Sequence, residues 1–556
     1  MGKAKKLFAV TTTVALTVSL AACGATSGSG STTTGSESTE SLPMTLAVQN
    51  DFTKINNLTE STSSELGIAQ NVMEGLVRYS QDGKEILPAI AEEWSLSDDQ
   101  KTYTFTLRDA QWADGTAVTA NDFVFAWNTV AKPETAASYA SFMEYIDGGA
   151  GAGTPDYKGP LNVTAVDDKT LEVTLAEPTP FFLSLLTFPT FFPVSEEFYT
   201  TVGADKYGTS ADTLLANGPF TISTWDRDQQ LVLGKNENYW EADVVSVPSV
   251  TFKVVGDEST RVQLFESGEL TRMGVSGDYF AQYKDNPGFY TEDDTTIWYL
   301  TLNIDNNASN PLLANKNFRQ ALSHAVNRQV VAEQVFKNGS FPANYVITKG
   351  LVANDGTDFR DASFAGNFQT DQETAKAVEL FEKAKTETGV TDAKLEISFV
   401  ESPRNTRLME VLQEELQKVL PGLTVELRKL PSSSYYDQLA AGDYQVAWAG
   451  WGPDYADPST MLSIFTSTDS HNYGKYNNPE YDKLYAEGLA LTGEDEVTAR
   501  FEKFAEAEKV LIDDQPIIPL MQAASSYVAQ PGVSDIVDSA FGGNTGFYKW
   551  AKHIAE

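Results

Sequence analysis

A helix followed directly by a strand restricts the fold of this chain more than any other feature of its sequence. Residues 407–430 read RLMEVLQEELQKVLPGLTVELRKL. Helical spacing places on one face Leu408, Leu412, Leu416 and Val419/Leu420. Pro421-Gly422 ends this helix, and the next residues alternate as a strand with Leu423, Val425 and Leu427 on one side. A helix that leads into a strand in this way is typical of layered α/β folds.

The same order of elements returns elsewhere in the second half of the chain. The segment 317–336, NFRQALSHAVNRQVVAEQVF, predicts a helix whose apolar positions are Phe318, Leu322, Ala325/Val326 and Val330. A further helix is predicted over about 497–512, and it precedes the apolar strand PIIPLM at 516–521. This alternation predicts an α/β protein built in layers.

The first part of the chain is richer in strands and turns. Residues 102–108 alternate, with Tyr103, Phe105 and Leu107 on one face of a predicted strand. Thr119 and Asp122 have the spacing of a capping box at the start of a helix over 120–130. The segment 161–177 predicts a hairpin that turns at residues 167–169.

The N-terminal residues have the order of a secretory signal. Lys3, Lys5 and Lys6 precede an apolar run over 7–22, which is shorter than the ~20 apolar residues of a membrane-spanning helix. Leu20-Ala21-Ala22-Cys23 resembles the bacterial lipobox, in which the cysteine is diacylated after cleavage before it. The alternative is a plain signal peptide with an incidental cysteine. Cys23 is the one cysteine in 556 residues, which favours the lipid and excludes an internal disulfide.

Composition after this signal favours a tethered protein that does not bind nucleic acid. Residues 23–43 are rich in Ser, Thr and Gly and predict a flexible tether to the outer face of the cell membrane. The whole chain carries 77 acidic and 40 basic residues, a net charge of −37. A nucleic-acid-binding protein needs basic patches instead.

The sequence offers little that would support catalysis or metal binding. Its three histidines, His324, His471 and His553, form no metal-ligand motif, and we expect His324 and His553 to be structural or solvated. The sequence contains neither GxSxG nor a phosphate-binding glycine loop after a strand. Chance carboxylate pairs leave a glycosidase conceivable. We expect no catalytic residue, no metal and no cofactor, and a binding protein rather than an enzyme.

Five stretches, in order, resemble the oligopeptide-binding proteins of peptide ABC transporters, which form family 5 of the bacterial extracellular solute-binding proteins. They are LPAIAEEWSLSDDQKTYTFTLRDAQWADGTAVTANDFVFAWN (87–128), LEVTLAEPTPFF (171–182), NGPFTISTWDRDQQLVLGKNENYW (217–240), FRQALSHAVNRQ (318–329) and GWGPDYADP (450–458). The resemblance covers roughly residues 44–550. The lipobox agrees with it independently.

The resemblance implies a periplasmic-binding-protein-like flytrap with two α/β lobes, a two-segment hinge and an inserted, smaller strand-rich domain. Domain I would comprise residues 44–78, 175–298 and 524–556. Domain II would be residues 79–174, and domain III residues 299–523. Residues 1–22 would be the signal peptide and 23–43 the tether.

The stretch VAWAGWGPDYADPS, residues 446–459, carries the candidate ligand site. It is too broken for a helix and too apolar for a solvated loop. Asp454 falls where the family keeps an aspartate that pairs with the α-ammonium of a peptide, and such a carboxylate forms a strong charge-assisted bond. Trp451 would form a wall and Gly452 would offer backbone to the peptide. Tyr139 matches a tyrosine of the cleft; for Trp451 and Tyr139 the alternative is core packing. Asp457, before Pro458, is expected to be a turn residue.

Two departures from the family pattern concern the carboxyl end of the ligand. Trp448 stands where relatives place an arginine, and Asn303, in TLNIDNN, stands in place of the carboxylate of YEIN. Trp448 therefore predicts longer peptides or an apolar side-chain pocket. Ser63 completes the set of candidate ligand-binding residues.

Four functions remain open from the sequence. The first is capture of short peptides for delivery to ABC permease subunits, by a monomer that its lipid holds on the membrane. The second is the same scaffold with another solute, such as a peptide signal, an oligosaccharide, haem or a metal chelate; Asp454 favours an amine, and the lack of a histidine cluster disfavours nickel. The third is a surface hydrolase, and the fourth is a lipid-tethered adhesin.

Overall fold

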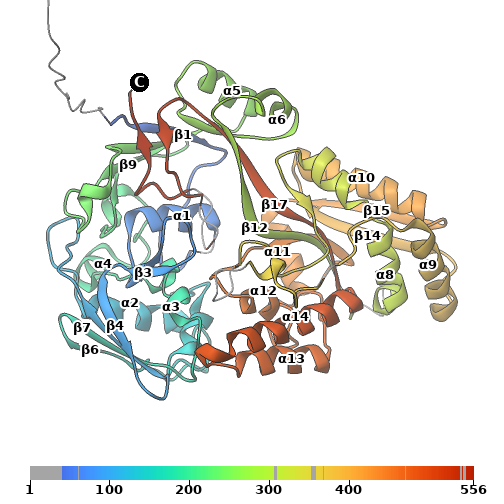
Figure 1. Ribbon diagram of the computed structural model, residues 1–556, viewed down its shortest axis with the longest axis horizontal. Coiled ribbons are helices and arrows are strands. Elements are labelled where there is room, and N and C mark those ends of the chain that lie inside the picture. Colours follow the sequence, from blue (N-terminus) through green and yellow to red (C-terminus); the bar gives the residue numbers. More distant parts are fainter. Residues whose placement is uncertain are drawn as a thin grey trace, which may run out of the picture. The chain divides into compact units, whose positions relative to one another are not determined.

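The computed structural model describes residues 41–555, except 61, 306–309, 352–357, 367, 470, 539–540 and 542–545. The predicted signal peptide, Cys23 and nearly all of the tether lie outside these residues. Within the described part, the strands form two four-stranded sheets, one seven-stranded sheet and two small hairpins (Figure 1).

The first four-stranded sheet joins the beginning of the described chain to a segment 200 residues further on. Its order is β1 (Met44–Val48), β10 (Ser249–Val254), β9 (Gln230–Lys235) and β8 (Phe220–Asp226). β1 runs parallel to β10, with Met44 beside Val250. This pairing joins the first two segments expected for domain I, although the boundaries of the three domains stay a prediction.

The second four-stranded sheet contains the predicted strand and hairpin. Its order is β4 (Ala91–Leu96), β5 (Thr102–Leu107), β7 (Thr170–Thr174) and β6 (Val163–Asp167). The alternation in β5 is confirmed, because its apolar face is at most 5% exposed. The capping box is also confirmed: the Thr119 amide donates to Asp122 over 2.8 Å at the start of α2 (Ala120–Ala131).

The seven-stranded sheet is the centre of the α/β part. Its order is β11 (Arg272–Val275), β17 (Ile517–Ala529), β12 (Phe289–Leu302), β16 (Val446–Trp451), β14 (Ala393–Val400) and β15 (Leu423–Leu430), and β13 (Phe341–Pro342) pairs with β17. The predicted helix-then-strand unit is confirmed: α10 (Pro403–Val419) leads into β15, which pairs in parallel with β14.

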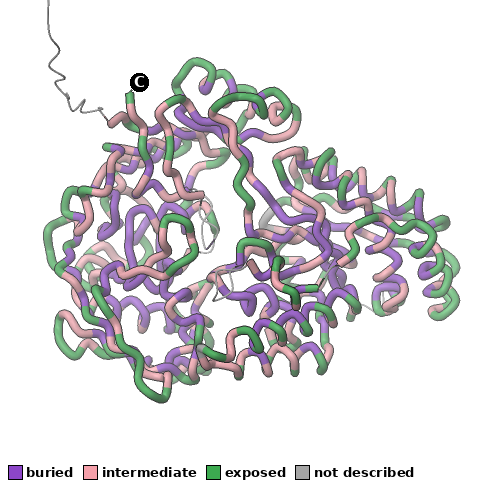
Figure 2. The backbone as a smooth tube through the Cα atoms, viewed as in Figure 1, coloured by how far each residue is buried: buried purple, intermediate pink, exposed green. Residues whose placement is uncertain are grey.

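Helices lie on both faces of this sheet, and strand alternation decides which side chain meets which layer. α8 (Lys316–Ala325), α9 (Thr374–Thr388) and α10 share a buried apolar cluster with Trp448. α12 (Ser459–Ser463), α13 (Pro479–Leu489) and α14 (Val497–Asp514) share another with Ala449 and Trp451. The strands between the two layers are mostly buried, and the outer turns of α9 and α10 alternate between exposed and buried (Figure 2).

The helix predicted over 317–336 is interrupted, which corrects the sequence prediction. α8 ends at Ala325, Val326 is extended, and a separate π-helix, η6, covers Val330–Phe336. Arg328 is the first helical residue after the interruption at 326–327 and is 2% exposed. Its guanidinium donates to the carbonyl groups of Ser323 and Pro519. Burial of this cation requires acceptors, and the interruption supplies one from α8 itself.

The remaining elements surround these sheets. The helices are α1 (Ser63–Val72), α3 (Phe182–Leu185), α4 (Glu196–Val202), α5 (Glu258–Glu266), α6 (Gly277–Tyr283), α7 (Pro311–Ala314) and α11 (Ser432–Ala441). The hairpins pair β2 (Val77–Tyr79) with β3 (Ile86–Pro88) and β18 (Val533–Ser534) with β19 (Lys552–His553). Short 3-10 helices are η1 (Pro133–Thr135), η2 (Ala140–Tyr145), η3 (Pro189–Phe191), η4 (Ala211–Thr213), η5 (Ala242–Val244), η7 (Phe359–Asp361) and η8 (Glu494–Glu496).

Candidate ligand-binding site

The run over 446–459 consists of a central strand, a loop and the first residue of a helix. β16 lies between β12 and β14 and ends at Trp451. Gly452 and Pro453 follow, and because proline has no backbone N–H the ladder of the sheet cannot continue through it. The loop over 452–458 therefore leaves the sheet at this point, and α12 begins at Ser459.

Contacts from several distant segments hold this loop. The Ala456 amide donates to the hydroxyl oxygens of Ser184 and Tyr79, at 2.9 and 3.1 Å. The ring of Tyr455 stacks on Phe181 with 4.8 Å between ring centres. Asp454, between the strand and these contacts, therefore stands on a fixed backbone.

Asp457 does more than the turn role predicted for it. Its Oδ1 accepts a hydrogen bond from the Ser459 amide at 2.9 Å, which confirms the turn. Its carboxylate also forms an ion pair with Arg500 at 2.8 Å, and the two side chains are 6% and 3% exposed. The sequence prediction missed this buried pair, which ties the loop to α14.

Asp454 and Tyr139 meet, although 315 residues separate them in the sequence. The Tyr139 hydroxyl donates to Oδ1 of Asp454 at 3.4 Å. Burial raises the pKa of Asp454 to about 7, and His471 and the Tyr139 hydroxyl oppose the rise in part. Burial also raises the pKa of Tyr139, so its hydroxyl keeps its proton and remains a donor. The carboxylate titrates near neutral pH.

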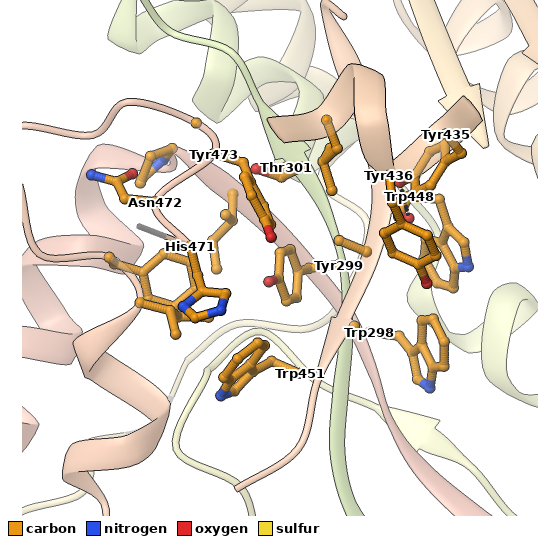
Figure 3. A pocket seen from close by; sticks show the side chains of 18 of the residues that line it. Trp298, Tyr299, Thr301, Tyr435, Tyr436, Trp448, Trp451, His471, Asn472 and Tyr473 are labelled. Carbon is orange, nitrogen blue, oxygen red and sulfur yellow. Dashed lines mark hydrogen bonds between the residues drawn. The ribbon is translucent and has the colours of Figure 1, made fainter. Parts of the chain in front are cut away.

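A cavity of about 350 Å³ has walls that are mainly aromatic (Figure 3). Asp454 and Tyr139 do not line it, but Trp451, three residues before Asp454, does. Trp451 lines it, as does His471, whose ring centre is 5.2 Å from the indole of Trp451. Nδ1 of His471 lies 3.1 Å from Oδ1 of Asp469 and donates a hydrogen bond to this carboxylate, and the hydrogen bond raises the pKa of His471. The other rings of the wall are those of Trp298, Tyr299, Tyr435, Tyr436, Trp448, Phe465, Tyr473 and Tyr476.

Trp448 and Trp451 line this cavity from β16, and Gly452 directly follows the strand. Trp448 is 5% exposed and stacks on Trp298 with 5.2 Å between ring centres and 12° between planes. Trp451 is half-buried, and its indole N–H donates to the Thr460 carbonyl at 3.3 Å. A Cβ on Gly452 would lie 3.1 Å from Oγ1 of Thr296, so the absence of a side chain leaves the backbone approachable here.

Asn303 and Ser63 are not brought to the cavity wall. Asn303 is 6% exposed, and its amide group donates to the carbonyls of Gly442 at 2.9 Å and Tyr444 at 3.3 Å. This is a structural role that joins the end of β12 to the turn before β16. Thr301, two residues earlier, lines the cavity instead. Ser63 is exposed at the first position of α1.

Sequence reasoning missed several residues that build the site. Trp298 and Tyr299 come from β12, Tyr436 from α11, and Arg404 from the first turn of α10. The aromatic pair inside the strand TTIWYLTL was one available signal. His471 was another, as one of three histidines, in the polar stretch TSTDSHNYGKY. Arg404 carried no local signal at all.

A second, larger cavity of about 740 Å³ adjoins the same loop through Tyr79, which lines it and accepts from Ala456. Its charged lining is strongly acidic. The carboxylates are Glu74, Asp82, Glu292, Asp293, Asp358, Asp361, Asp535 and Asp538, and the cations are Arg78 and Lys84. The two cavities therefore differ in the sign of their charge.

No group of three or more His, Cys, Asp and Glu side chains in the described part of the chain is placed to hold a metal ion. No described helix combines the length and the apolar character needed to cross a bilayer.

The chain is similar to known peptide-binding proteins over most of its length. Residues 85–473 match the family described as bacterial extracellular solute-binding proteins, family 5 middle. The dipeptide-binding protein DppE of Bacillus subtilis is 33% identical over 537 residues, 94% of this chain and 94% of that protein.

Solved structures extend the similarity to the fold. The substrate-binding domain of an oligopeptide ABC transporter from Bacillus anthracis aligns with a TM-score of 0.81 and 31% identity, over 93% of this chain and 100% of that one. OppA of Listeria monocytogenes bound to peptide aligns with a TM-score of 0.80 and 31% identity, over 93% and 99%. The predicted fold class, an α/β solute-binding protein of two lobes, is confirmed.

Proposed function

Because this chain belongs to family 5 of the bacterial extracellular solute-binding proteins, we propose that it captures short peptides beside Asp454 and delivers them to an ABC permease for uptake. The observation that carries the proposal is the carboxylate of Asp454. It is half-buried and, within the described residues, has no Lys, Arg or His nitrogen within 4.0 Å. Burying a charge without a partner is costly, and a ligand ammonium would supply the partner.

The surroundings of Asp454 suit a peptide better than other solutes. An ionised carboxylate in a partly desolvated site forms a strong charge-assisted hydrogen bond with –NH3+ and rejects ligands without one. The aromatic cavity beside it offers apolar surface to side chains. Gly452, at the end of β16, leaves backbone groups open to an extended ligand. Relatives named as dipeptide- and oligopeptide-binding proteins support the same ligand class.

We propose that the protein binds peptides without cleaving them. The test is mass spectrometry of the molecules released when the purified protein is denatured mildly. We expect short peptides with free amino termini, and incubation of the protein with a peptide mixture should leave every peptide intact. Recovery of a sugar, haem or metal chelate in place of peptides would favour the second use of the scaffold, and cleavage of the mixture would favour a hydrolase.

The affinity for peptides should depend on pH around neutrality. A ligand ammonium favours the ionised form of Asp454, so binding lowers its pKa from about 7 and releases a proton. Affinity should fall as the pH drops below about 7, by up to tenfold per pH unit, and should fall again above ~8 as the peptide amine loses its proton. Calorimetry in buffers of different ionisation heat measures both the affinity and the released proton.

Tyr139→Phe provides the matched variant for this pH profile. It removes one hydrogen-bond donor to the carboxylate, which should raise the pKa of Asp454 further. The acid limb of the profile should then move to higher pH. A profile that is flat from pH 5 to 8 in both proteins would contradict the assignment of Asp454 to the ammonium.

We further propose that the chain is a monomeric lipoprotein on the outer face of the cell membrane. The lipobox-like Leu20–Cys23 sequence, the basic residues before it and the polar tether after it support this location. The lone cysteine would carry a diacylglyceryl group.

Cys23→Ala should therefore release the protein from the membrane fraction or leave the signal uncleaved. Without the thiol no thioether to the lipid can form. Fractionation of cells, followed by mass measurement of the purified protein, reports both outcomes, with Cys23→Ser as a variant of nearly equal size. Normal cleavage with unchanged membrane retention would contradict the lipid anchor.

A further inference from the structure

β15 (Leu423–Leu430) forms an outer edge of the seven-stranded sheet, because no described strand pairs with the side of β15 that faces away from β14. An open edge of this kind presents a row of backbone N–H and C=O groups with which another chain can pair. Many proteins limit this risk with a very short edge strand, but β15 has eight residues. Another feature must therefore keep this edge from pairing.

Two glutamine side chains of α10 bind the backbone of this edge strand. The N–H group of Val425 donates to Oε1 of Gln417 at 3.0 Å, and the carbonyl of Val425 accepts from Nε2 of Gln413 at 2.7 Å. The N–H and C=O groups of one strand residue point to the same side of the strand. Because both groups of Val425 bond to α10, they point away from β14, and the glutamines occupy them at the open edge.

The helical repeat of α10 brings the two glutamines to this position. Gln413 and Gln417 are four residues apart, so they lie on the same face of the helix. Each directly follows a buried leucine, Leu412 or Leu416, and these leucines hold α10 against the sheet. Figure 1 shows α10 beside β15. A glutamine carries a donor and an acceptor on a long side chain, which lets the pair satisfy both backbone groups.

The sequence of β15 is complementary to a second copy of itself. Two antiparallel copies related by a two-fold axis at Leu427 would place Glu426 opposite the partner's Arg428, and these opposite charges attract. Val425 would then lie opposite the partner's Lys429 and exchange two backbone hydrogen bonds with it. Those bonds need the same N–H and C=O groups that the glutamines occupy. The glutamines and a second copy therefore compete for this edge.

We infer that Gln413 and Gln417 close the edge of β15 against pairing with a second copy of this chain. This contact gives the monomeric state proposed above a structural cause, and it does not depend on the ligand. The proposed lipid anchor makes such a contact useful, because anchoring holds many copies at one membrane surface and raises their local concentration. An open edge would meet other copies often under these conditions.

The experiment replaces both side chains in the full-length protein, as Gln413→Met with Gln417→Met. Methionine keeps the length and the helix propensity of glutamine but lacks its amide group. Sedimentation velocity over a dilution series should show a dimer of the double variant that grows with concentration, and wild type should stay monomeric. Hydrogen exchange should be about tenfold faster at the Val425 amide of the dilute variant than in wild type. The amide should become protected again as the dimer forms.

Glu414→Met with Lys418→Met is the matched control. These two residues have the same spacing on α10 and are exposed, so their replacement also adds apolar surface but leaves the glutamines in place. The control should stay monomeric. A monomeric glutamine variant, equal dimerisation of both double variants, or a dimer in which the Val425 amide stays unprotected would overturn the inference. A wild-type dimer would contradict the proposed monomeric state, and it would overturn the inference as well where dilution speeds exchange at Val425.

Discussion

Asp454→Ala is expected to weaken the binding of a free peptide by roughly 30-fold to several-thousand-fold, since truncating one member of a buried charge pair costs ~2–5 kcal/mol. The variant leaves the α-ammonium of the ligand in a half-buried aromatic site without its partner. Asp454→Asn keeps the shape and one acceptor, so its loss should be smaller. Titration calorimetry at pH 8, where Asp454 is mostly ionised, measures both losses.

An N-acetylated peptide is the control for this prediction. It has no ammonium, so it should bind wild type weakly and be nearly indifferent to Asp454→Ala. Free and acetylated peptide with the two proteins form a double-mutant cycle that isolates the pair. A coupling energy near zero would give Asp454 a structural role and assign amine recognition elsewhere.

Asp454→Asn should weaken peptide binding but stabilise the ligand-free protein. Burial holds the pKa of Asp454 at about 7, above its ordinary value of 3.8. A raised pKa in the folded state means that this group favours folding below its unfolded pKa and that the benefit is lost as the pH rises through about 7. Asp454→Asn should therefore raise the thermal midpoint of the ligand-free protein at pH 8. A lowered midpoint would mean that the carboxylate supports the loop.

Arg500→Ala is expected to cost about 3–5 kcal/mol of unfolding free energy, because it leaves Asp457 buried without its partner. The two side chains are at most 6% exposed, and Arg500 also packs against Phe181, Phe501 and Phe504. Urea unfolding of the ligand-free protein measures the loss. Because the pair holds the loop that carries Asp454, peptide affinity should fall as well.

An exposed pair on another part of the surface provides the comparison. Arg428 contacts Glu396 and Asp443 at 3.3 and 3.4 Å, with its own side chain 31% exposed. Arg428→Ala should cost less than ~1 kcal/mol, since solvent screens such pairs. The double variant Arg500→Leu with Asp457→Asn should recover part of the stability lost in Arg500→Ala. Equal losses in Arg500→Ala and Arg428→Ala would contradict the importance of the buried pair.

The local elements and the family could be predicted from the sequence. The capping box at Thr119, the alternation in β5 and the unit formed by α10 and β15 all follow from periodicities of two or 3.6 residues. Such patterns depend on neighbours within one or two turns, so the sequence displays them directly. The collinear motifs added the family, and with it the candidate Asp454.

The site itself was only partly predictable, because its members are distant in the sequence. Asp454, Trp448 and Trp451 share one local motif. The family resemblance placed Tyr139 in the cleft, and only the structure shows that its hydroxyl meets Asp454. Asn303, at the end of β12, has a structural role instead, since its amide group donates to the carbonyls of Gly442 and Tyr444. Ser63 is exposed on α1. Nothing in the sequence around Asn303 or Ser63 indicates that these residues lie away from the cavity.

Only the tertiary structure decided which charges are buried, paired or free. The helix that the pattern made continuous is broken just before Arg328, whose buried guanidinium donates to carbonyls from β17 and α8. Arg500 is paired inside the protein, whereas Arg404 lines the cavity without an ion pair within the described residues. All three are arginines in or beside amphipathic helices. The environment of each is set by the element that packs against it, which no local pattern records.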